Sequence, residues 1–146
     1  MTTLGEAWEL SRKDSGLAVV STLRADSTIQ ASLVNTGVIE RDGEAMLAFV
    51  TNGRVKLANL RHRPQVTVAF RAGWQWGVVE GQAALTGPDD PRPGVDAEVL
   101  RLLLREIFTA AGGTHDDFDT YDRVMREERR TAVFVHPSRV YANPGQ

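Results

Sequence analysis

The stretch "EAMLAFVTNGRVKLANLRHRPQVTVAF", residues 44–70, contains the signals that decide the fold. It begins with an apolar run at residues 45–50, and "VTVAF" at residues 66–70 alternates along the chain; both patterns are typical of β-strands. Between them, the sequence predicts a short helix over residues 53–62. Pro64 stops this helix, because the residue before a proline is pushed away from helical backbone angles.

The flanking sequence supplies the other strands. "IQASLVNTGVIE" is joined to the strand ending at residue 51 by "RDG", and Asp-Gly is a strong hairpin signal. "WQWGVVEGQAALT" contains two internal glycines, which are typical of a bulged or bent strand. Strands that mostly follow one another without helices between them predict a mainly β (α+β) protein, a six-stranded antiparallel barrel with helices packed outside. We expect these strands at residues 17–23, 29–40, 44–51, 66–70, 74–86 and 131–142.

Two longer helices are expected between the last two strands. The first covers residues 96–113, carries leucines on one face and ends at a Gly-Gly pair. The second covers residues 114–130, where Thr114 and Asp117 resemble a capping box. Helical spacing further predicts ion pairs within this second helix. The pairs are Asp119 with Arg123 and Asp122 with Arg126.

Composition limits the possible functions. The 146 residues fit one domain, residues 1–146, and a formal net charge of −2 argues against a broad nucleic-acid surface while leaving room for a local basic pocket. The chain has no cysteine, which excludes disulfides, thiolate chemistry and zinc clusters. It contains neither a signal-like start nor a run long enough to cross a bilayer, so we expect a cytoplasmic protein.

The helix at residues 53–62 begins with two cations. Arg54 and Lys56 lie in its first turn, where the helix dipole disfavours positive charge. A bound anion would reverse this effect, because the dipole and the side chains would then attract the same ligand. Thr51 and Asn52 add polar donors and Gly53 permits close backbone approach, so the sequence predicts a phosphate site. The alternative is that both cations are solvated and Asn52 caps the helix.

The same stretch carries a family resemblance. "FVTNGRVKLANLRHRPQVTVAF" followed by "WQWGVVEG" resembles the cofactor-binding core of the pyridoxamine 5'-phosphate oxidase-like split β-barrel superfamily, and the similarity extends over about residues 17–141. The two late helices and the ending "RRTAVFVHPSRVYANPG" resemble the deazaflavin (coenzyme F-420)-dependent reductases of the B group of actinobacteria. This resemblance implies a split barrel that binds 8-hydroxy-5-deazaflavin, coenzyme F-420, at a homodimer interface.

The resemblance also implies which residues bind the cofactor. Those that correspond to the phosphate-tail site include two cations and an amide, and Arg129 is a candidate for contact with the tail or the substrate. Others correspond to positions beside the ring and the ribityl chain, and two tryptophans correspond to ring contacts reached from the second subunit. The tail residues are Arg54, Lys56 and Asn59; the ring residues are Gln30, Ser32, Asn35, Val50 and Thr51; the tryptophans are Trp74 and Trp76.

Several of these residues also have simpler explanations. Trp74 and Trp76 are two positions apart and could fill a dimer core, since aromatic residues are common in both cores and interfaces. Gln30 and Ser32 share a strand face and would be ordinary polar positions on an exposed sheet. The three histidines show no metal-ligand spacing, so no metal site is expected. Neither a nucleophile–base–acid triad nor a pair of catalytic carboxylates is apparent.

The function that the resemblance implies is oxidoreduction. Reduced F-420 would donate hydride to an electron-poor, conjugated small-molecule acceptor, while the protein orients the ring and excludes water. The lack of an acid–base constellation is consistent with such a reaction. Two alternatives fit the same residues: an FMN-dependent oxidoreductase on the same barrel, and a non-catalytic cofactor carrier.

Overall fold

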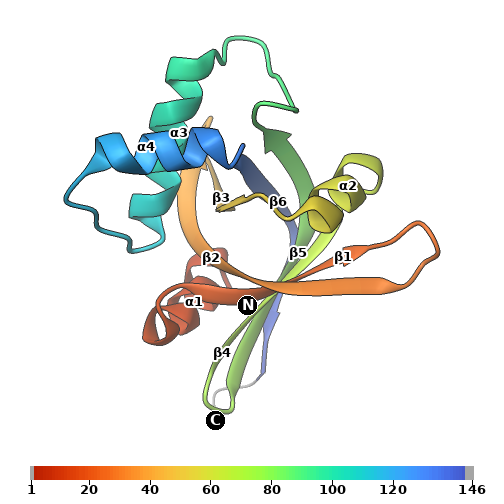
Figure 1. The fold of residues 1–146 in the computed structure, drawn as a ribbon. Helices are drawn as coiled ribbons and strands as arrows, with labels where there is room; N and C mark the ends of the chain where they lie inside the picture. The colour runs from red at the N-terminus through yellow and green to blue at the C-terminus, as the bar shows by residue number, and fades with distance from the viewer. Residues whose placement is uncertain (1, 144–146) are drawn as a thin grey trace.

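The computed structural model of the protein, which describes residues 2–143, contains a closed barrel of six antiparallel strands (Figure 1). The strand order around the barrel is β1-β2-β3-β6-β5-β4, so the last strand is inserted between the third and the fifth. The predicted α+β barrel with peripheral helices is therefore confirmed. The strands are β1 (Leu17–Leu23), β2 (Ile29–Arg41), β3 (Glu44–Thr51), β4 (Gln65–Ala72), β5 (Gln75–Thr86) and β6 (Thr131–Ala142).

Alternation along the strands builds the barrel core. On β4, for example, Val66, Val68 and Phe70 are buried whereas the residues between them are partly exposed. Successive side chains of a strand point to opposite faces, so one face of each strand fills the barrel interior. Two β3 residues, Leu47 and Phe49, are fully buried in this same core.

The predicted irregularity of β5 is a bulge opposite β6. The register between the two strands shifts between Glu80 and Gly81, where Gly81 pairs with Pro137. A Cβ atom on Gly81 would lie 2.2 Å from the carbonyl oxygen of His136, so only glycine fits this close backbone approach. The bulge also accommodates Pro137, which cannot donate a ladder hydrogen bond.

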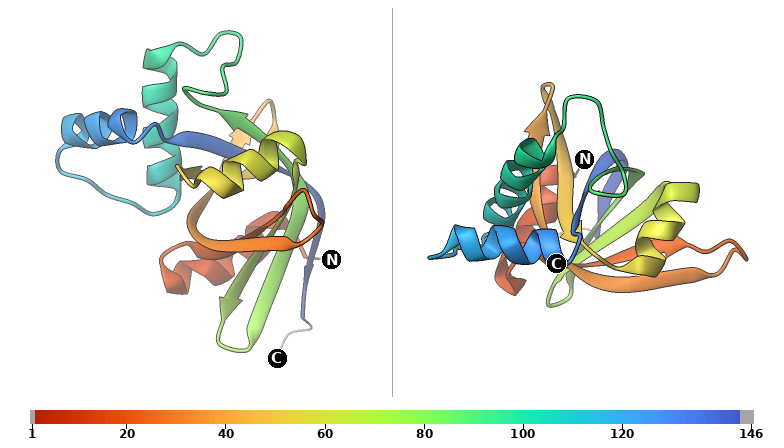
Figure 2. Two further views of the ribbon diagram at one scale, coloured as in Figure 1. Left: turned by 45° about the vertical axis from the view of Figure 1, so that its right-hand side comes forward. Right: turned by 45° about the horizontal axis from the view of Figure 1, so that its top comes forward.

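Helices cover the barrel on different sides (Figure 2). Helix α1 (Leu4–Glu9) and the 3-10 helix η1 (Leu10–Asp14) pack on one end of the barrel, with Leu4 and Ala7 buried in its core. Helix α2 (Arg54–His62) connects β3 to β4. Within residues 2–143, no helix is both long and apolar enough to span a membrane.

Helix α3 (Ala97–Ala110) packs against the outside of β2, β3 and β6, and helix α4 (Phe118–Glu127) packs on α3. The predicted capping box is wrong, because α4 begins at Phe118 and Asp117 is its N-cap, accepting a hydrogen bond from the backbone N–H of Thr120. A second apolar core cluster lies between α3 and the barrel. It contains Ile39, Met46, Ala48, Leu103, Leu104, Ile107, Ala132 and Phe134.

The predicted ion pairs within α4 are also wrong. Asp122 pairs with Arg101 and Arg105 of α3, at 2.9 Å from Arg101 Nη1 and 2.9 Å from Arg105 Nε. These two guanidinium groups hold the pKa of the Asp122 carboxyl below its ordinary value. The carboxylate therefore joins α4 to α3 and leaves Arg126 without the predicted partner.

Candidate functional site

The N-terminus of α2 has no side-chain cap. Gly53 is the N-cap residue, no acidic residue lies in the first turn, and Asn52 forms no capping hydrogen bond. The first N–H groups of a helix have no partner within the helix and carry partial positive charge. The alternative in which Asn52 caps the helix is therefore wrong, and these N–H groups remain available to a ligand.

Lys56 is buried at this helix end, with only 5% of its surface exposed. Its Nζ donates a hydrogen bond to Thr51 Oγ1 at 3.2 Å and lies 5.8 Å from the centre of the Phe49 ring. Burial, and secondarily the charge of Arg130, lowers the pKa of the Lys56 ammonium. Among residues 2–143, no carboxylate pairs with Lys56. A buried ammonium without a counter-charge is unfavourable unless an anion joins it.

The hydroxyl groups beside Lys56 also have hydrogen-bonding capacity to spare. Thr51 Oγ1 accepts bonds from Lys56 Nζ and, at 3.1 Å, from the backbone N–H of Gly53, so its own hydrogen remains to be donated. Thr131 faces Thr51 across the β3–β6 ladder, and its buried Oγ1 has no hydrogen-bond partner within residues 2–143. The set comprises one ammonium, two hydroxyls and a free helix end, which is the donor chemistry that a phosphate requires.

Arg54 points away from Lys56, because residues two apart on a helix do not share a face. It is exposed and lines a broad hollow of about 780 Å³ together with Asn52, Asn59 and Arg129. Arg129 adopts a left-handed backbone conformation (φ 51°) and pairs with Asp89 at 2.6 Å. The structure thus brings Arg54 and Arg129 to one hollow, and places Lys56 separately on the inner side of α2.

A hydrogen-bonded chain joins two of the predicted polar residues. Asn59 Nδ2 donates to Thr22 Oγ1 at 3.0 Å, and Thr22 Oγ1 donates to Gln30 Oε1 at 2.7 Å. Asn59 and Thr22 are buried, and Gln30 is partly exposed. Ser32 lies on the same face of β2, and its buried Oγ has no partner among the described residues. These groups form a polar strip running from α2 along β1 and β2.

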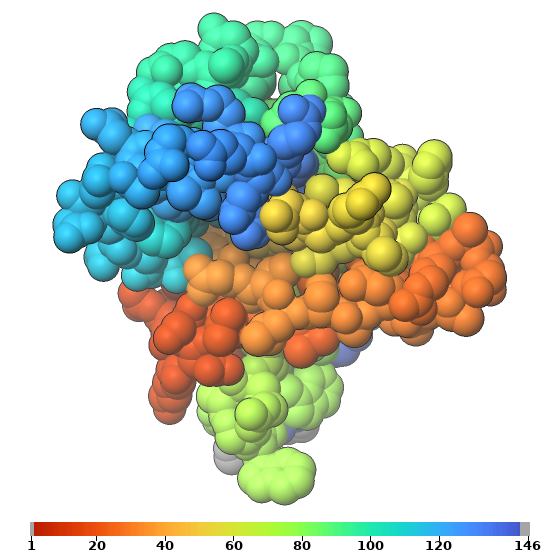
Figure 3. Space-filling view, in the orientation of Figure 1, coloured from red at the N-terminus to blue at the C-terminus, as the bar shows by residue number. Residues whose placement is uncertain are grey.

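Asn35 and Val50 line a smaller hollow of about 260 Å³ between the barrel and helices α3 and α4. Arg130 and Tyr121 line it from the helical side. The side-chain amide of Asn35 already forms one hydrogen bond, because its Nδ2 donates to the carbonyl oxygen of Ser15. In Figure 3 the C-terminal end of α4 (blue) meets the N-terminal end of α2 (yellow) above β2 (orange). The hollow and the Lys56 site are therefore neighbours.

Trp74 lies in the turn between β4 and β5, and Trp76 is the second residue of β5. This β4–β5 turn is at the opposite end of the molecule from α2 (Figure 1). Trp74 is 92% exposed, whereas the Trp76 ring meets that of Tyr141 edge to face, with centroids 6.2 Å apart. Within one chain the structure does not bring the tryptophans to the other predicted site residues. A contact with the same site therefore requires a second chain.

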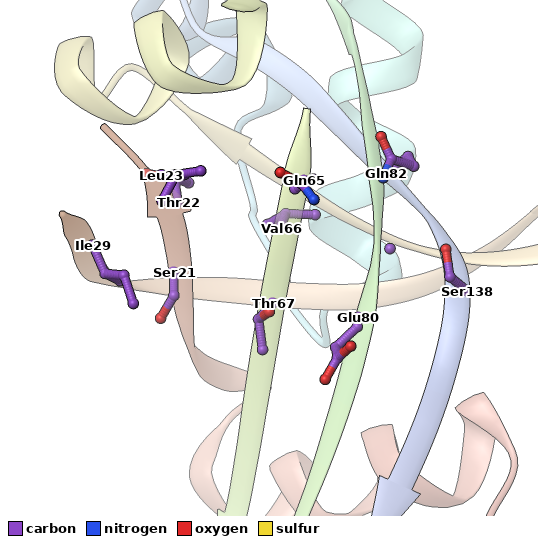
Figure 4. Close-up of a pocket in the computed structure, with 11 residues that line it drawn as sticks. Ser21, Thr22, Leu23, Ile29, Gln65, Val66, Thr67, Glu80, Gln82 and Ser138 are labelled. Atoms are coloured by element: carbon purple, nitrogen blue, oxygen red, sulfur yellow. The ribbon is translucent and has the colours of Figure 1, made fainter. Parts of the chain in front are cut away.

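The outward face of the sheet carries an exposed apolar row. Five residues pair in succession across β2, β1, β4, β5 and β6, and Leu33 and Val19 in this row are 61% and 44% exposed. Beside the row is a hollow of about 310 Å³, where the side chains of Ser21, Thr67 and Glu80 project from adjacent strands (Figure 4). The apolar row consists of Leu33, Val19, Ala69, Val78 and Tyr141.

Three residues of the site were not predicted. Thr22 links Asn59 to Gln30, Thr131 contributes the unpaired hydroxyl, and Arg130 adds positive charge beside Lys56. In the sequence, Thr22 stands in an otherwise largely apolar strand, and nothing in that pattern distinguishes a site residue from an ordinary buried threonine. Thr131 and Arg130 come near Thr51 only because β6 pairs with β3, a topology that periodicity does not reveal.

No known protein-family profile matches the chain. Among solved structures, it is similar to a conserved hypothetical protein from Mycobacterium tuberculosis, with TM-score 0.67 and 18% identity over 97% of this chain and 84% of that one. It is similar to an F420 reductase (TM-score 0.57, 18% identity, 86% of this chain and 88% of that one). It is also similar to a pyridoxamine 5'-phosphate oxidase-related, FMN-binding protein from Nostoc punctiforme (TM-score 0.62, 12% identity, 97% and 86%). The chain has the split-barrel fold of these proteins.

Within this split barrel, the described site is suited to binding an anion beside a polar strip. The residues near Lys56 offer donors: an ammonium, hydroxyls, amides and helix N–H groups. Asn59, Thr22 and Gln30 are fixed by their mutual hydrogen bonds, so the strip is ordered before a ligand arrives. A phosphate joined to an organic group that forms hydrogen bonds has the acceptor chemistry that these donors match.

Proposed function

We propose that the protein is an oxidoreductase that binds the deazaflavin coenzyme F-420 and supports hydride transfer to a conjugated small-molecule acceptor. The observation that carries the proposal is the buried Lys56 ammonium, which has no carboxylate partner among residues 2–143 and lies at an uncapped helix end. The unpaired hydroxyls of Thr131 and Ser32 fit the same group, because each can bond to a ligand oxygen or nitrogen.

The proposal assigns roles to the residues according to their position. Lys56, Thr51 and the N–H groups of α2 hold the phosphate, and Arg54 attracts the negatively charged tail from the outer hollow. Gln30, Ser32 and Asn59 lie along the polar strip and orient the ribityl chain and the ring. Asn35 and Val50 border the ring from the neighbouring hollow, and Arg129 reaches the outer part of the tail.

We assign the exposed apolar row to a homodimer interface. An exposed apolar row running across five strands is costly in water and marks a protein interface. A second copy packed there would bury Val19, Leu33 and Tyr141. Trp74 of that copy, which is 92% exposed, and Trp76, which packs beside Tyr141, would then lie at the interface and reach the first chain's cofactor site.

When bound, reduced F-420 supplies the hydride. The protein's own residues contribute binding, orientation and exclusion of water, and no described side chain is required as a general acid. Lys56 keeps its proton on Nζ while it is paired with the phosphate, because an adjacent anion raises the pKa that burial lowers. The acceptor is an electron-poor conjugated molecule lying between the ring and the partner's tryptophans.

Two alternatives use the same geometry. FMN has a single terminal phosphate that Lys56 could hold equally well, and an FMN-binding protein is among the similar structures. A non-catalytic carrier would bind the cofactor without turnover. The absorption spectrum of the cofactor that copurifies from an F-420-producing host distinguishes the two chromophores, and an FMN spectrum would refute the deazaflavin assignment.

Single-turnover kinetics separates an enzyme from a carrier. Reduced F-420 bound to the protein is mixed with quinones, enones and tetrapyrroles, and its reoxidation is followed by absorbance. We expect at least one acceptor class to be reduced faster than by free cofactor. Equal rates with and without protein for the whole panel would favour the carrier. Sedimentation of wild type and Leu33→Arg tests the dimer, which the variant is expected to dissociate.

A further inference from the structure

The linker of residues 87–96, between β5 and α3, forms an arch beside the helices (Figures 1 and 2). It contains three prolines, which restrict its backbone. Several interactions hold it in place. They are the paired backbone bonds between Gly87 and Asp90 (3.1 and 3.0 Å), the two bonds from Arg61 to Asp90 (2.8 and 2.7 Å), Arg129 to Asp89 (2.6 Å), and Arg92 Nε to the carbonyl oxygen of Leu85 (2.7 Å).

A cavity of about 420 Å³ lies between this arch and helices α3 and α4, and we call it the linker cavity. Its volume falls within the range of about 300–1,000 Å³ that small-molecule sites occupy. Because the arch is fixed at several points, it cannot collapse onto the helices to fill the space. The apolar walls of the linker cavity are formed by Pro88, Pro91, Val95, Leu100, Leu104 and Met125.

Among residues 2–143, one arginine side chain at the wall of the linker cavity has no partner. Its wall contains four arginines and three carboxylates, and every carboxylate is engaged: Asp96 caps α3, Glu98 pairs with Arg101, and Asp122 pairs with α3 arginines. The guanidinium of Arg126, by contrast, forms no hydrogen bond or ion pair with any residue in the described part of the chain. The linker cavity thus combines an apolar interior with an unpaired guanidinium at its wall.

We infer that the linker cavity is a second binding site, which takes a small molecule with an apolar body and a single carboxylate. The apolar body would occupy the space between Val95 and Met125, and the carboxylate would pair with Arg126. A guanidinium binds a carboxylate in a two-pronged geometry, so Arg126 selects an acid over a neutral molecule of the same shape.

This inference does not depend on the proposed cofactor. Met125 and Arg130 line both the linker cavity and the smaller hollow at Val50, so the two sites share a wall, but Lys56 does not line the linker cavity. A ligand of the linker cavity should therefore bind in the absence of F-420 or FMN. It should also bind to Lys56→Met as well as to wild type.

Calorimetric titration without cofactor tests the inference with two probes, decanoate and decan-1-ol, below the concentration at which decanoate forms micelles. Wild type is expected to bind one decanoate per chain. Val95→Trp, which places an indole in the linker cavity, should weaken binding of both probes by about tenfold or more. Arg126→Gln should weaken decanoate about fivefold and leave decan-1-ol unchanged, since Arg126 is exposed and its charge is partly screened.

Arg123→Gln is the matched control, because Arg123 is an exposed arginine of the same helix that pairs with Glu127 and does not line the linker cavity. It should bind both probes as wild type does. The inference is overturned if wild type shows no saturable decanoate binding, or if Val95→Trp, folded by circular dichroism, binds as tightly as wild type. Should Val95→Trp fail to fold, Arg126→Gln decides: equal decanoate affinity in Arg126→Gln and Arg123→Gln also overturns it.

Discussion

Lys56→Met should stabilise the cofactor-free protein. The substitution replaces a buried ammonium by an apolar side chain of similar length at a position that is 5% exposed. It removes one hydrogen bond to a charged group, worth about 1.5–3 kcal/mol, and also the larger cost of burying an unpaired charge. Thr51 keeps the N–H of Gly53 as a donor, so no acceptor is left unsatisfied. We expect a net gain of about 1 kcal/mol in the free energy of unfolding at neutral pH.

The pH dependence of this gain has a definite sign. The folded-state pKa of Lys56 is lowered, so between that pKa and the ordinary value of 10.5 the unfolded chain binds more protons than the folded one. The free energy of unfolding of wild type therefore rises with pH across this window, relative to the variant. The advantage of Lys56→Met should be fully present below the folded-state pKa and shrink as pH approaches 10.5.

The same variant should bind F-420 more weakly. A charge-assisted hydrogen bond to phosphate is worth about 1.5–3 kcal/mol, which corresponds to a loss of about 10- to 100-fold in affinity. Urea unfolding and fluorescence titration measure the two effects. Lys13→Met is the control, since Lys13 is the only other lysine of the chain and is exposed. A variant that is less stable than wild type yet binds F-420 normally would refute the assignment of an anion to Lys56.

Three further substitutions test the surroundings. Thr22→Val removes the hydroxyl between Asn59 and Gln30; it should lower the free energy of unfolding by about 1–3 kcal/mol in urea, and an unchanged value would contradict the chain of hydrogen bonds. Asp122→Asn should cost about 2 kcal/mol at pH 7, and because the native carboxyl pKa is lowered, the difference from wild type should vanish as pH falls through that pKa. Gly37→Ala would place a Cβ atom 2.6 Å from the backbone of α3, so thermal unfolding should show a loss of about 1–3 kcal/mol; an unchanged midpoint would mean that α3 moves freely.

Most of the barrel was predictable from the sequence, because its strands are specified locally. Alternation in "VTVAF" and the Asp42-Gly43 turn, where both residues have positive φ, predict strands and a hairpin without knowledge of the rest of the chain. The order in which strands pair is not local. Insertion of β6 between β3 and β5 is what places Thr131 opposite Thr51, and no periodicity indicates it.

The candidate site was predictable only in part, because the surroundings of its residues depend on how the helices pack. The excess of positive charge at the start of α2 is visible in the sequence, but the different surroundings of Arg54 and Lys56 depend on what packs around the helix. The partners of Asp122 were missed because inter-helix ion pairs depend on the packing of α4 on α3. The tryptophans lie at the far end of the barrel from α2, so their predicted contact with the cofactor depends on a second chain.

Equilibrium titration of the purified protein with oxidised F-420 and, separately, with FMN tests the central claim most directly. We expect saturable binding of one F-420 per chain that is weakened by added salt, because the buried Lys56 and the free end of α2 attract the phosphate. Binding of F-420 should be tighter than that of FMN, because Arg54 and Arg129 in the outer hollow would contact a charged tail that FMN lacks. Tighter binding of FMN would contradict the choice of cofactor. Failure to bind either one would contradict the phosphate site itself.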